Sequence, residues 1–465
     1  MMRLSEAASV LNGRASGGDP LFRRVSTDTR ALKPGDLFVA LRGERFDGHT
    51  FLAQAHAAGA AAAMVDSDVG QLPLPTVVVD DTRLALGRLA AHWRSRFFVP
   101  LVALTGSSGK TTVKEMLAAI LREAAGGEEG DVVLATRGNL NNDIGVPIML
   151  LELAPTHRYA VIEMGMNHAG EIRYLTQLAS PGVALITNAG RAHIEFLGSE
   201  EAIAQAKGEI FEGLKSDGVA VINADDRHAP MWRTLAGTRR QIEFGLDHPA
   251  PVTATYRERT LETEVTLTTP QGTAATTVRA RGAHNVRNAL AAAAAAYALD
   301  VPIDTIAAGL SQYSGVKGRL QMKAGLNGSV VVDDTYNANP ESVRAAIDVL
   351  AQAVGRKLLV FGDMGELGRE APRLHTELGA YAKTAGIDQL VTLGEHSART
   401  TQGFGAGAHH YDQIEDLIRE TARLLAPGVT VLVKGSRFMR MERVVAALVS
   451  DGGQAGGEKR EAKKQ

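Results

Sequence analysis

The stretch Ala103-Leu104-Thr105-Gly106-Ser107-Ser108-Gly109-Lys110-Thr111-Thr112 decides the fold of this chain. The apolar run 101–104 is typical of a buried strand, and residues 113–121 carry apolar side chains at helical spacing. A glycine-rich turn between a strand and a helix is the context of a phosphate-binding loop, because its N–H groups and the helix dipole face an anion. The stretch therefore predicts a nucleotide-binding α/β domain, with an ordinary strand-to-helix turn as the alternative.

Within this loop, the ammonium of Lys110 would reach the outer phosphates of ATP, and the hydroxyl of Thr111 would bind Mg2+. The common pattern begins with a glycine where this chain has Leu104. The other candidate ATP-binding residues of the loop are Thr105, Gly106, Ser107, Ser108, Gly109 and Thr112.

Composition limits the classes of protein that the chain can belong to. Its 465 residues are 45% hydrophobic and 22% charged, as in an ordinary globular protein of two to four domains. A net charge of −2 implies no nucleic-acid partner, and the lack of cysteine excludes disulfides and thiolate metal sites and fits the cytoplasm. The first residues lack an apolar leader, and the longest apolar run, 289–298, is too short to cross a membrane, so we expect neither a signal peptide nor membrane insertion.

The alternation of strands and helices predicts three α/β domains followed by a disordered tail. We expect a small N-terminal domain (1–84), a central phosphate-loop domain with a mostly parallel sheet (85–314), a C-terminal Rossmann-like doubly wound domain (315–450) and the tail (451–465). Three features are specific enough to check: a helix over 50–63, a hairpin over 252–279 on the central parallel sheet, and a restart of the strand pattern at 329–333.

Two polar residues follow buried strands of the central domain. Glu163 ends the apolar strand 160–164, where an α/β sheet presents ligands, and could hold Mg2+ beside the phosphate loop or simply cap a turn. His193 lies in the polar loop after the strand 183–187 and converges on the same crevice, although a lone histidine is often structural.

Lys207 lies on the apolar stripe of a predicted helix. It follows Ile203 by four residues and precedes Ile210 by three, so its ammonium would be buried at a cost unless it is paired or neutral. A desolvated lysine is nucleophilic and could take up CO2 as a carbamate. The alternative is a lysine whose ammonium extends to solvent.

Polar stretches also open the later helices. Asn285, in the stretch that starts the alanine-rich helix, could contact a nucleotide base. Arg319 lies where the third domain begins and could clamp a terminal phosphate. The loop 333–340 follows a strand and precedes a helix, and could bind a ligand or form a well-capped turn.

Taken together, these motifs resemble the Mur ligase family of cell-wall peptide synthetases. They occur in order as TGSSGKTT (105–112), NLNNDIGVP (139–147), IEMGMNHAGEI (162–172), AHIEFLGS (192–199), AKGEIF (206–211), AHNVRNA (283–289), GRLQ (318–321) and DDTYNANP (333–340). With FGDMGELG (361–368), they indicate the branch that adds D-alanyl-D-alanine. Met164 and Met166, flanking Gly165, depart slightly from that branch.

The resemblance implies an ATP-dependent, ADP-forming ligase that phosphorylates the carboxylate of a UDP-N-acetylmuramoyl tripeptide. The amine of D-alanyl-D-alanine would then attack the acyl phosphate. Mg2+ would lie on Thr111 and Glu163, with His193 serving a second Mg2+, and Lys207 would be carbamylated. Catalytic roles fall to Lys110, Lys207, His193 and Arg319, while Asn285, Arg319 and Asp334 would contact ATP.

The same resemblance implies residues that bind the two peptide substrates in a cytoplasmic, monomeric enzyme. They are Thr27, Asp28, Thr29, Arg30, Glu44, Arg45 and Phe46 in the N-terminal domain, Asn139, Asn141, Asn142 and Asn167 in the central domain, and Tyr336 and Asn337 in the C-terminal domain. The competing hypotheses are a sibling ligase that adds a single amino acid, a folate polyglutamylating enzyme, a phosphate-loop kinase or switch, and a nucleotide-regulated scaffold.

Overall fold

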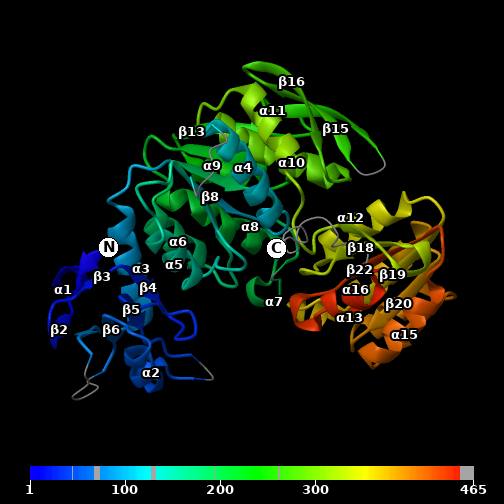
Figure 1. Cartoon of the computed structure of the whole chain (residues 1–465). Helices are drawn as coiled ribbons and strands as arrows, with labels where there is room; N and C mark the ends of the chain where they lie inside the picture. The colour runs from blue at the N-terminus through cyan, green and yellow to red at the C-terminus, as the bar shows by residue number, and fades with distance from the viewer. Residues whose placement is uncertain (44–45, 68–73, 127–131, 193, 260–261, 451–465) are drawn as a thin grey trace, which may run out of the picture.

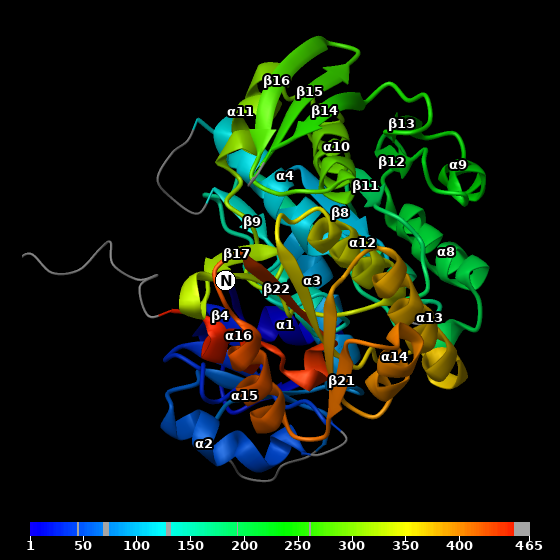
Figure 2. The same ribbon diagram turned by 90° about the vertical axis from the view of Figure 1, so that its right-hand side faces the viewer.

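The computed structural model describes residues 1–43, 46–67, 74–126, 132–192, 194–259 and 262–450. Three lobes follow one another along the chain, with the central lobe between the N-terminal and C-terminal lobes (Figure 1). The view turned by 90° shows the C-terminal lobe in front of the central one (Figure 2).

The N-terminal lobe is built on a five-stranded sheet in the order β2-β7-β6-β5-β4. Its elements are β1 (Met2–Arg3), α1 (Leu4–Leu11), β2 (Arg14–Ser16), β3 (Leu21–Phe22), β4 (Arg24–Ser26), β5 (Asp36–Val39), η1 (Gly48–Phe51), α2 (Leu52–Ala57), β6 (Ala62–Val65) and β7 (Thr76–Val78). The predicted helix over 50–63 is too long. It ends at Ala57 because residues 62–65 are buried on both faces, as in a central strand.

The central lobe has a six-stranded, wholly parallel sheet in the order β13-β12-β11-β8-β10-β9. The strands are β8 (Leu101–Thr105), β9 (Val133–Ala135), β10 (Tyr159–Glu163), β11 (Val183–Ile186), β12 (Val219–Asn223) and β13 (Arg240–Phe244). The helices are α3 (Thr82–Arg94), α4 (Lys110–Ala124), α5 (Gly145–Leu151), α6 (Glu171–Ala179), α7 (Ile194–Leu197), α8 (Glu200–Gly208), η2 (Glu209–Gly213), α9 (Ala229–Ala236), α10 (Ala283–Tyr297) and α11 (Ile303–Gln312).

Strand β8 carries the phosphate loop in the middle of this sheet. All five of its residues are buried, as expected for a parallel strand covered by helices on both faces. Its neighbours are β10 on one side and β11 on the other, with Glu163 paired to Leu104 and Ile186 paired to Thr105. The polar residues that follow β10 and β11 therefore flank the phosphate loop.

The stretch 252–279 differs from its prediction. It forms a separate three-stranded antiparallel sheet of β14 (Thr253–Glu258), β15 (Thr263–Thr269) and β16 (Gly272–Val278). Within the described residues, a single bridge between Phe244 and Val252 links it to β13. The reason is packing, because Val265, Leu267 and Val278 join the hydrophobic core under α4, α10 and α11 instead of extending the parallel sheet.

The C-terminal lobe contains a doubly wound sheet in the order β17-β18-β22-β19-β20-β21, with only β17 antiparallel to its neighbour. Its strands are β17 (Gln321–Ala324), β18 (Val330–Asp334), β19 (Arg356–Gly362), β20 (Gln389–Leu393), β21 (Ala408–Tyr411) and β22 (Val429–Lys434). Its helices are η3 (Leu326–Gly328), α12 (Pro340–Ala351), η4 (Gly368–Glu370), α13 (Ala371–Thr384), α14 (Ser397–Phe404), α15 (Ile414–Leu424), η5 (Arg437–Met439) and α16 (Glu442–Leu448). The edge strands β17 and β21 escaped prediction because their residues are half-exposed and lack an apolar run.

Candidate active site

The phosphate loop is held in shape by the segment that follows β11. Ser108 donates its backbone N–H to Asn188 Oδ1 at 2.9 Å, and the Ser107 hydroxyl accepts from the N–H of Gly190 at 2.9 Å. Gly109 has φ +82°, and a Cβ there would lie 2.3 Å from Asn288 Oδ1, so the turn into α4 requires glycine. Contacts within the protein thus hold the phosphate loop in its curved shape. The Nζ of Lys110 donates to Gly106 O at 2.6 Å across this loop.

Glu163 lies beside this loop with one carboxylate oxygen available for a ligand. The residue is 2% exposed, its Oε1 accepts from Asn141 Nδ2 at 2.9 Å, and its N–H donates to Thr136 Oγ1 at 2.8 Å. Its Oε2 is buried and has no hydrogen-bond partner among the described residues. A buried carboxylate oxygen of this kind fits a Mg2+ ion, with the hydroxyl of the buried Thr111 on the adjacent helix as a second donor.

The described segments contain no group of three or more His, Asp or Glu that could hold a metal ion. Mg2+ typically takes one or two protein oxygens and completes its shell with phosphate oxygens and water.

Five charged side chains interact at this edge of the sheet. Burial and the positive charge of Arg319 lower the pKa of Lys110, while the negative charges of Glu163 and Glu366 oppose that shift. The same Lys110 acts on Lys207, whose pKa is lowered well below its ordinary value mainly by burial and further by this second ammonium. Residues from α4, β10, α8 and the C-terminal lobe therefore converge on one point.

Lys207 occupies the buried face of α8, as the spacing indicated. It is 1% exposed, and it lies among Ile203, Ile210 and Phe211 in the core beneath the sheet. A lysine in this setting is neutral over a wider pH range than a surface lysine and is therefore a better nucleophile toward CO2.

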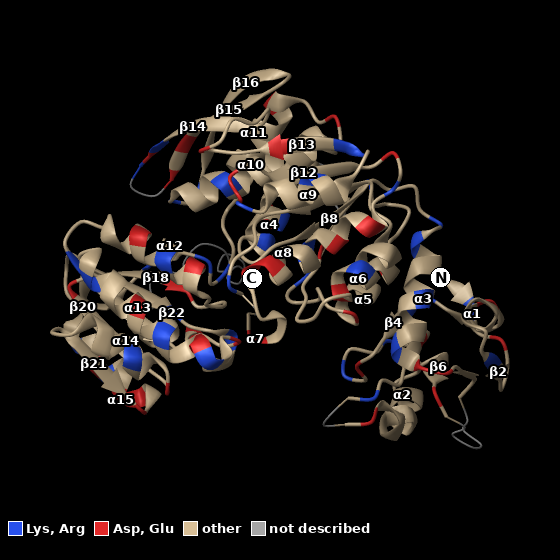
Figure 3. Cartoon of the chain, turned by 180° about the vertical axis from the view of Figure 1, so that it is seen from behind, with Lys and Arg blue, Asp and Glu red and all other residues tan. Residues whose placement is uncertain are grey.

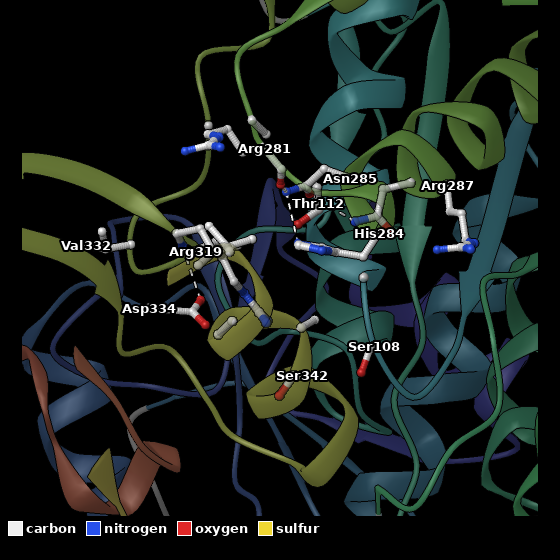
Figure 4. Close-up of a pocket in the computed structure, with 18 of the residues that line it drawn as sticks. Ser108, Thr112, Arg281, His284, Asn285, Arg287, Arg319, Val332, Asp334 and Ser342 are labelled. Atoms are coloured by element: carbon white, nitrogen blue, oxygen red, sulfur yellow. Dashed lines mark hydrogen bonds between the residues drawn. The ribbon is translucent and has the colours of Figure 1, made fainter. Parts of the chain in front are cut away.

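A cavity of about 1140 Å³ opens between the central and C-terminal lobes (Figure 4). The phosphate loop and Asn285 at the start of α10 border it on the central side, and Arg319 and Asp334 border it on the C-terminal side. The Arg319 guanidinium lies 4.3 Å from the ring centroid of Tyr336, and its Nε is buried without a hydrogen-bond partner among the described residues. Asn285, Arg319 and Asp334 thus share a cavity of the size that a nucleotide needs.

Two further polar residues line the cavity. Lys434, at the end of β22, pairs with Asp334 Oδ2 at 2.5 Å and donates to Asn337 O at 3.0 Å. His284 faces the same space, and burial together with the charge of Lys434 lowers its pKa to about 4, so it is neutral at physiological pH. The sequence signal for Lys434 is a polar residue at the end of a strand, and the signal for His284 is a polar residue at the start of a helix.

The predicted asparagines divide into those that reach the site and those that do not. Asn141 reaches Glu163, whereas Asn142 Oδ1 accepts from the N–H of Gly145 at 2.8 Å and caps α5. Asn139 and Asn167 are exposed. Asn337 is exposed too, and its Oδ1 accepts from the N–H of Ala338 at 2.9 Å.

The predicted substrate residues of the N-terminal lobe lie apart from the cavity, whose lining begins at Ser107. Thr27, Asp28, Thr29 and Arg30 form the turn between β4 and β5, where Arg30 pairs with Asp28 at 2.7 Å. Phe46 is 60% exposed. Glu44, Arg45, His193 and the tail 451–465 lie outside the described residues.

Acidic and basic positions alternate over all three lobes (Figure 3). None of the helices in the described segments has the length and hydropathy needed to span a bilayer.

Matches to known protein families are found in all three lobes of the chain. Residues 22–94, 104–296 and 318–437 match the Mur ligase family catalytic domain, the Mur ligase middle domain and the Mur ligase glutamate ligase domain. The UDP-N-acetylmuramoyl-tripeptide–D-alanyl-D-alanine ligase of Escherichia coli is 45% identical over 453 residues, which are 97% of this chain and 98% of that protein.

Solved structures agree with this result. MurF from Acinetobacter baumannii superposes with a TM-score of 0.89 at 38% identity, covering 96% of this chain and 98% of that one. MurF ligase from Thermotoga maritima in complex with ADP gives a TM-score of 0.82 at 28% identity, covering 92% and 97%. The chain therefore belongs to the Mur ligase family.

Proposed function

We propose that this protein is an ATP-dependent, ADP-forming ligase that joins D-alanyl-D-alanine to UDP-N-acetylmuramoyl-tripeptide through an acyl phosphate. The observation that carries the proposal is that Lys110, in the loop whose residues 107–109 line the cavity between the central and C-terminal lobes, interacts electrostatically with Glu163, Lys207 and Arg319. The full-length relatives, which carry the name of that ligase, supply the substrates.

The first step requires a phosphoryl group to pass from ATP to a carboxylate. Hydroxide is a poor leaving group, so a carboxylate reacts with an amine only after phosphorylation turns its oxygen into phosphate. The amides of the phosphate loop and Lys110 would hold the outer phosphates, and Arg319 would approach the γ-phosphate from the C-terminal lobe as an always-charged donor. Its buried Nε, which has no hydrogen-bond partner in the part of the chain that the structure describes, supports this role.

Mg2+ bound by Thr111 and Glu163 would neutralise the oxyanions that accumulate on the phosphates. Glu163 would present Oε2 to it, with Oε1 held by Asn141. His193 would serve a second Mg2+, as the resemblance implies.

Lys207 would act as its carbamate. A lysine that is 1% exposed and has a pKa well below its ordinary value carries the neutral amine that adds to CO2. The product is an anion beside Lys110, so carbamylation adds an attraction to the Lys110 ammonium, which would repel the protonated form of Lys207. The carbamate would then face the same cations as the transferring phosphoryl group.

The remaining residues would position the three substrates. Asn285 and Asp334 would contact the adenosine part of ATP, and Tyr336, Asn337 and the asparagines after β9 and β10 would face the peptide substrates. Residues 27–30 and 44–46 would bind the UDP group. The proposal also includes domain boundaries at residues 84, 314 and 450, a monomeric state and a cytoplasmic location.

The test is a ligation assay with ATP, Mg2+ and UDP-N-acetylmuramoyl-tripeptide, to which D-alanyl-D-alanine, D-alanine, L-lysine, diaminopimelate or L-glutamate is added in turn. We expect stoichiometric ADP, phosphate and amide product with the dipeptide alone. Equal turnover with a single amino acid would favour a sibling ligase. Phosphate release without an amide would favour a kinase or a nucleotide switch.

A further inference from the structure

Lys434 ends β22 at the wall of the cavity, and the proposed mechanism gives it no role. It is 1% exposed, and its ammonium pairs with Asp334 Oδ2 at 2.5 Å and donates to Asn337 O at 3.0 Å. Burying an ammonium is costly, and the carboxylate of Asp334, itself 5% exposed, offsets that cost. The two residues are register partners on the parallel strands β18 and β22, so the sheet itself holds the pair together.

The second oxygen of Asp334 holds the turn that carries Arg319. Asp334 Oδ1 accepts from the N–H of Leu320 at 3.2 Å, and the N–H of Tyr336 donates to Gly318 O at 3.1 Å. Figure 4 shows Asp334 next to this turn and the guanidinium of Arg319 extending from the turn into the cavity. The residues on either side of Arg319 are therefore joined to the end of β18.

The turn has a backbone conformation that its own residues do not favour. Gly318 has φ +72° and Leu320 has φ +49°, in the left-handed region that leucine rarely adopts. A Cβ on Gly318 would lie 3.2 Å from the backbone nitrogen of Tyr336, so the turn lies close against the segment that follows β18. Such a backbone typically persists where the surroundings impose it, and Asp334 supplies one of the contacts that do so.

Arg319 depends on this turn for the direction of its side chain. Its guanidinium lies 4.3 Å from the ring centroid of Tyr336, and its Nε has no hydrogen-bond partner among the described residues. The backbone of the turn and the tyrosine ring therefore set where the guanidinium lies. Phosphoryl transfer is sensitive to such placement, because a displacement of about 1 Å can reduce the rate roughly a hundredfold.

We propose that Lys434 is a positioning residue for phosphoryl transfer, because it orients the carboxylate that holds the turn of Arg319. The inference rests on the proposed function and adds to it a residue that acts on Arg319 through a buried ion pair. It also gives a reason for a lysine–aspartate pair on the cavity wall, since apolar residues of similar volume are often as stable in such a place.

The experiment is a double-mutant cycle on the formation of the acyl phosphate, which hydroxylamine traps as hydroxamate at saturating ATP. We expect Lys434→Met to slow this step at least tenfold, with KM for UDP-N-acetylmuramoyl-tripeptide changed less than twofold. In the Arg319→Ala background the same substitution should slow the step less than twofold, because no guanidinium remains to be aimed. A merely structural role would produce the same slowing in both backgrounds.

The matched control is Lys323→Met, which breaks a neighbouring lysine–aspartate pair of the same sheet. Lys323 lies on β17 and pairs with Asp333 Oδ2 at 2.6 Å, and neither residue is among the described residues that line the cavity. The rate and KM of this control should stay within twofold of the wild-type values. If Lys434→Met is unstable by thermal melting, the double variant Lys434→Met/Asp334→Asn, which removes both buried charges, replaces it in both backgrounds with the same expectation.

Two results would overturn the inference. A wild-type rate of hydroxamate formation without Lys434 would show that the ion pair does not serve the reaction. Equal slowing in both backgrounds would show that Lys434 acts on something other than Arg319. Failure of the proposed function would look different, because the wild-type protein itself would then form no hydroxamate.

Discussion

Lys207 is a lysine buried beside a second lysine, an arrangement that opposes its charge. Such a residue costs stability and is typical of a functional site. A change that removes the amine removes both its chemistry and its cost, so the two are tested by separate measurements: activity for the first and unfolding for the second.

Substituting Lys207→Ala should reduce ligation at least a thousandfold, since the anion that faces the same cations as the transferring phosphoryl group is lost. Short carboxylates such as acetate or formate should restore part of the rate by entering the space left behind. Rates are measured by phosphate release with and without added carboxylate. Full activity of the unrescued variant would exclude the carbamate.

Substituting Lys207→Met should stabilise the protein against unfolding by roughly 1 kcal/mol or more at pH 7 in CO2-depleted buffer. The folded chain releases this proton well below pH 10.5, whereas the unfolded chain keeps it up to about that pH. Unfolding of the wild type therefore takes up a proton, and its stability rises with pH across that window. The advantage of methionine should shrink as the pH rises, in urea titrations at several pH values. A constant advantage would mean that burial does not shift this lysine.

At the scale of single elements, α4 links the phosphate loop to the candidate Mg2+ ligand. Lys114, one turn beyond Lys110, is 2% exposed and donates to Thr136 O at 2.5 Å. Thr136 Oγ1 accepts from the N–H of Glu163 at 2.8 Å. A shift of α4 is therefore transmitted to the carboxylate.

Substituting Lys114→Met should weaken Mg2+-dependent nucleotide binding about tenfold, as when a residue that supports a metal ligand is lost. The measurement is the affinity for a fluorescent ATP analogue with and without Mg2+. The exposed Lys215→Met serves as the control. An unchanged Mg2+ dependence in the Lys114 variant would contradict this link.

The sequence was informative where an element is defined by its own residues. The phosphate loop, the parallel strands and the buried position of Lys207 follow from apolar runs and helical spacing. The antiparallel sheet β14–β16 became independent because Val265 and Leu267 join the core on the side of α10, which no local pattern encodes. Likewise, Asp334 and Lys434 pair although a hundred positions separate them. The side chain of Asn142 is engaged at the start of α5, because its Oδ1 accepts from the N–H of Gly145.

At the scale of the whole molecule, the substrates come from different lobes. The candidate UDP-binding turn 27–30 belongs to the N-terminal lobe, while the cavity lies between the other two. We expect the lobes to approach one another so that the carboxylate reaches the phosphate, as in enzymes that close over their substrates.

Adding a non-hydrolysable ATP analogue with Mg2+ and UDP-N-acetylmuramoyl-tripeptide should therefore reduce the radius of gyration measured by small-angle X-ray scattering. The Lys110→Ala variant, which cannot hold the outer phosphates, should show a smaller change. An unchanged radius in the wild type would mean that the substrates meet without closure.

The most direct test follows one oxygen atom. The UDP-linked tripeptide is labelled with 18O in its terminal carboxylate, and the phosphate released during ligation to D-alanyl-D-alanine is analysed by mass spectrometry. Transfer through an acyl phosphate predicts one 18O in each phosphate formed. Phosphate without the label, released while amide accumulates, would contradict the account.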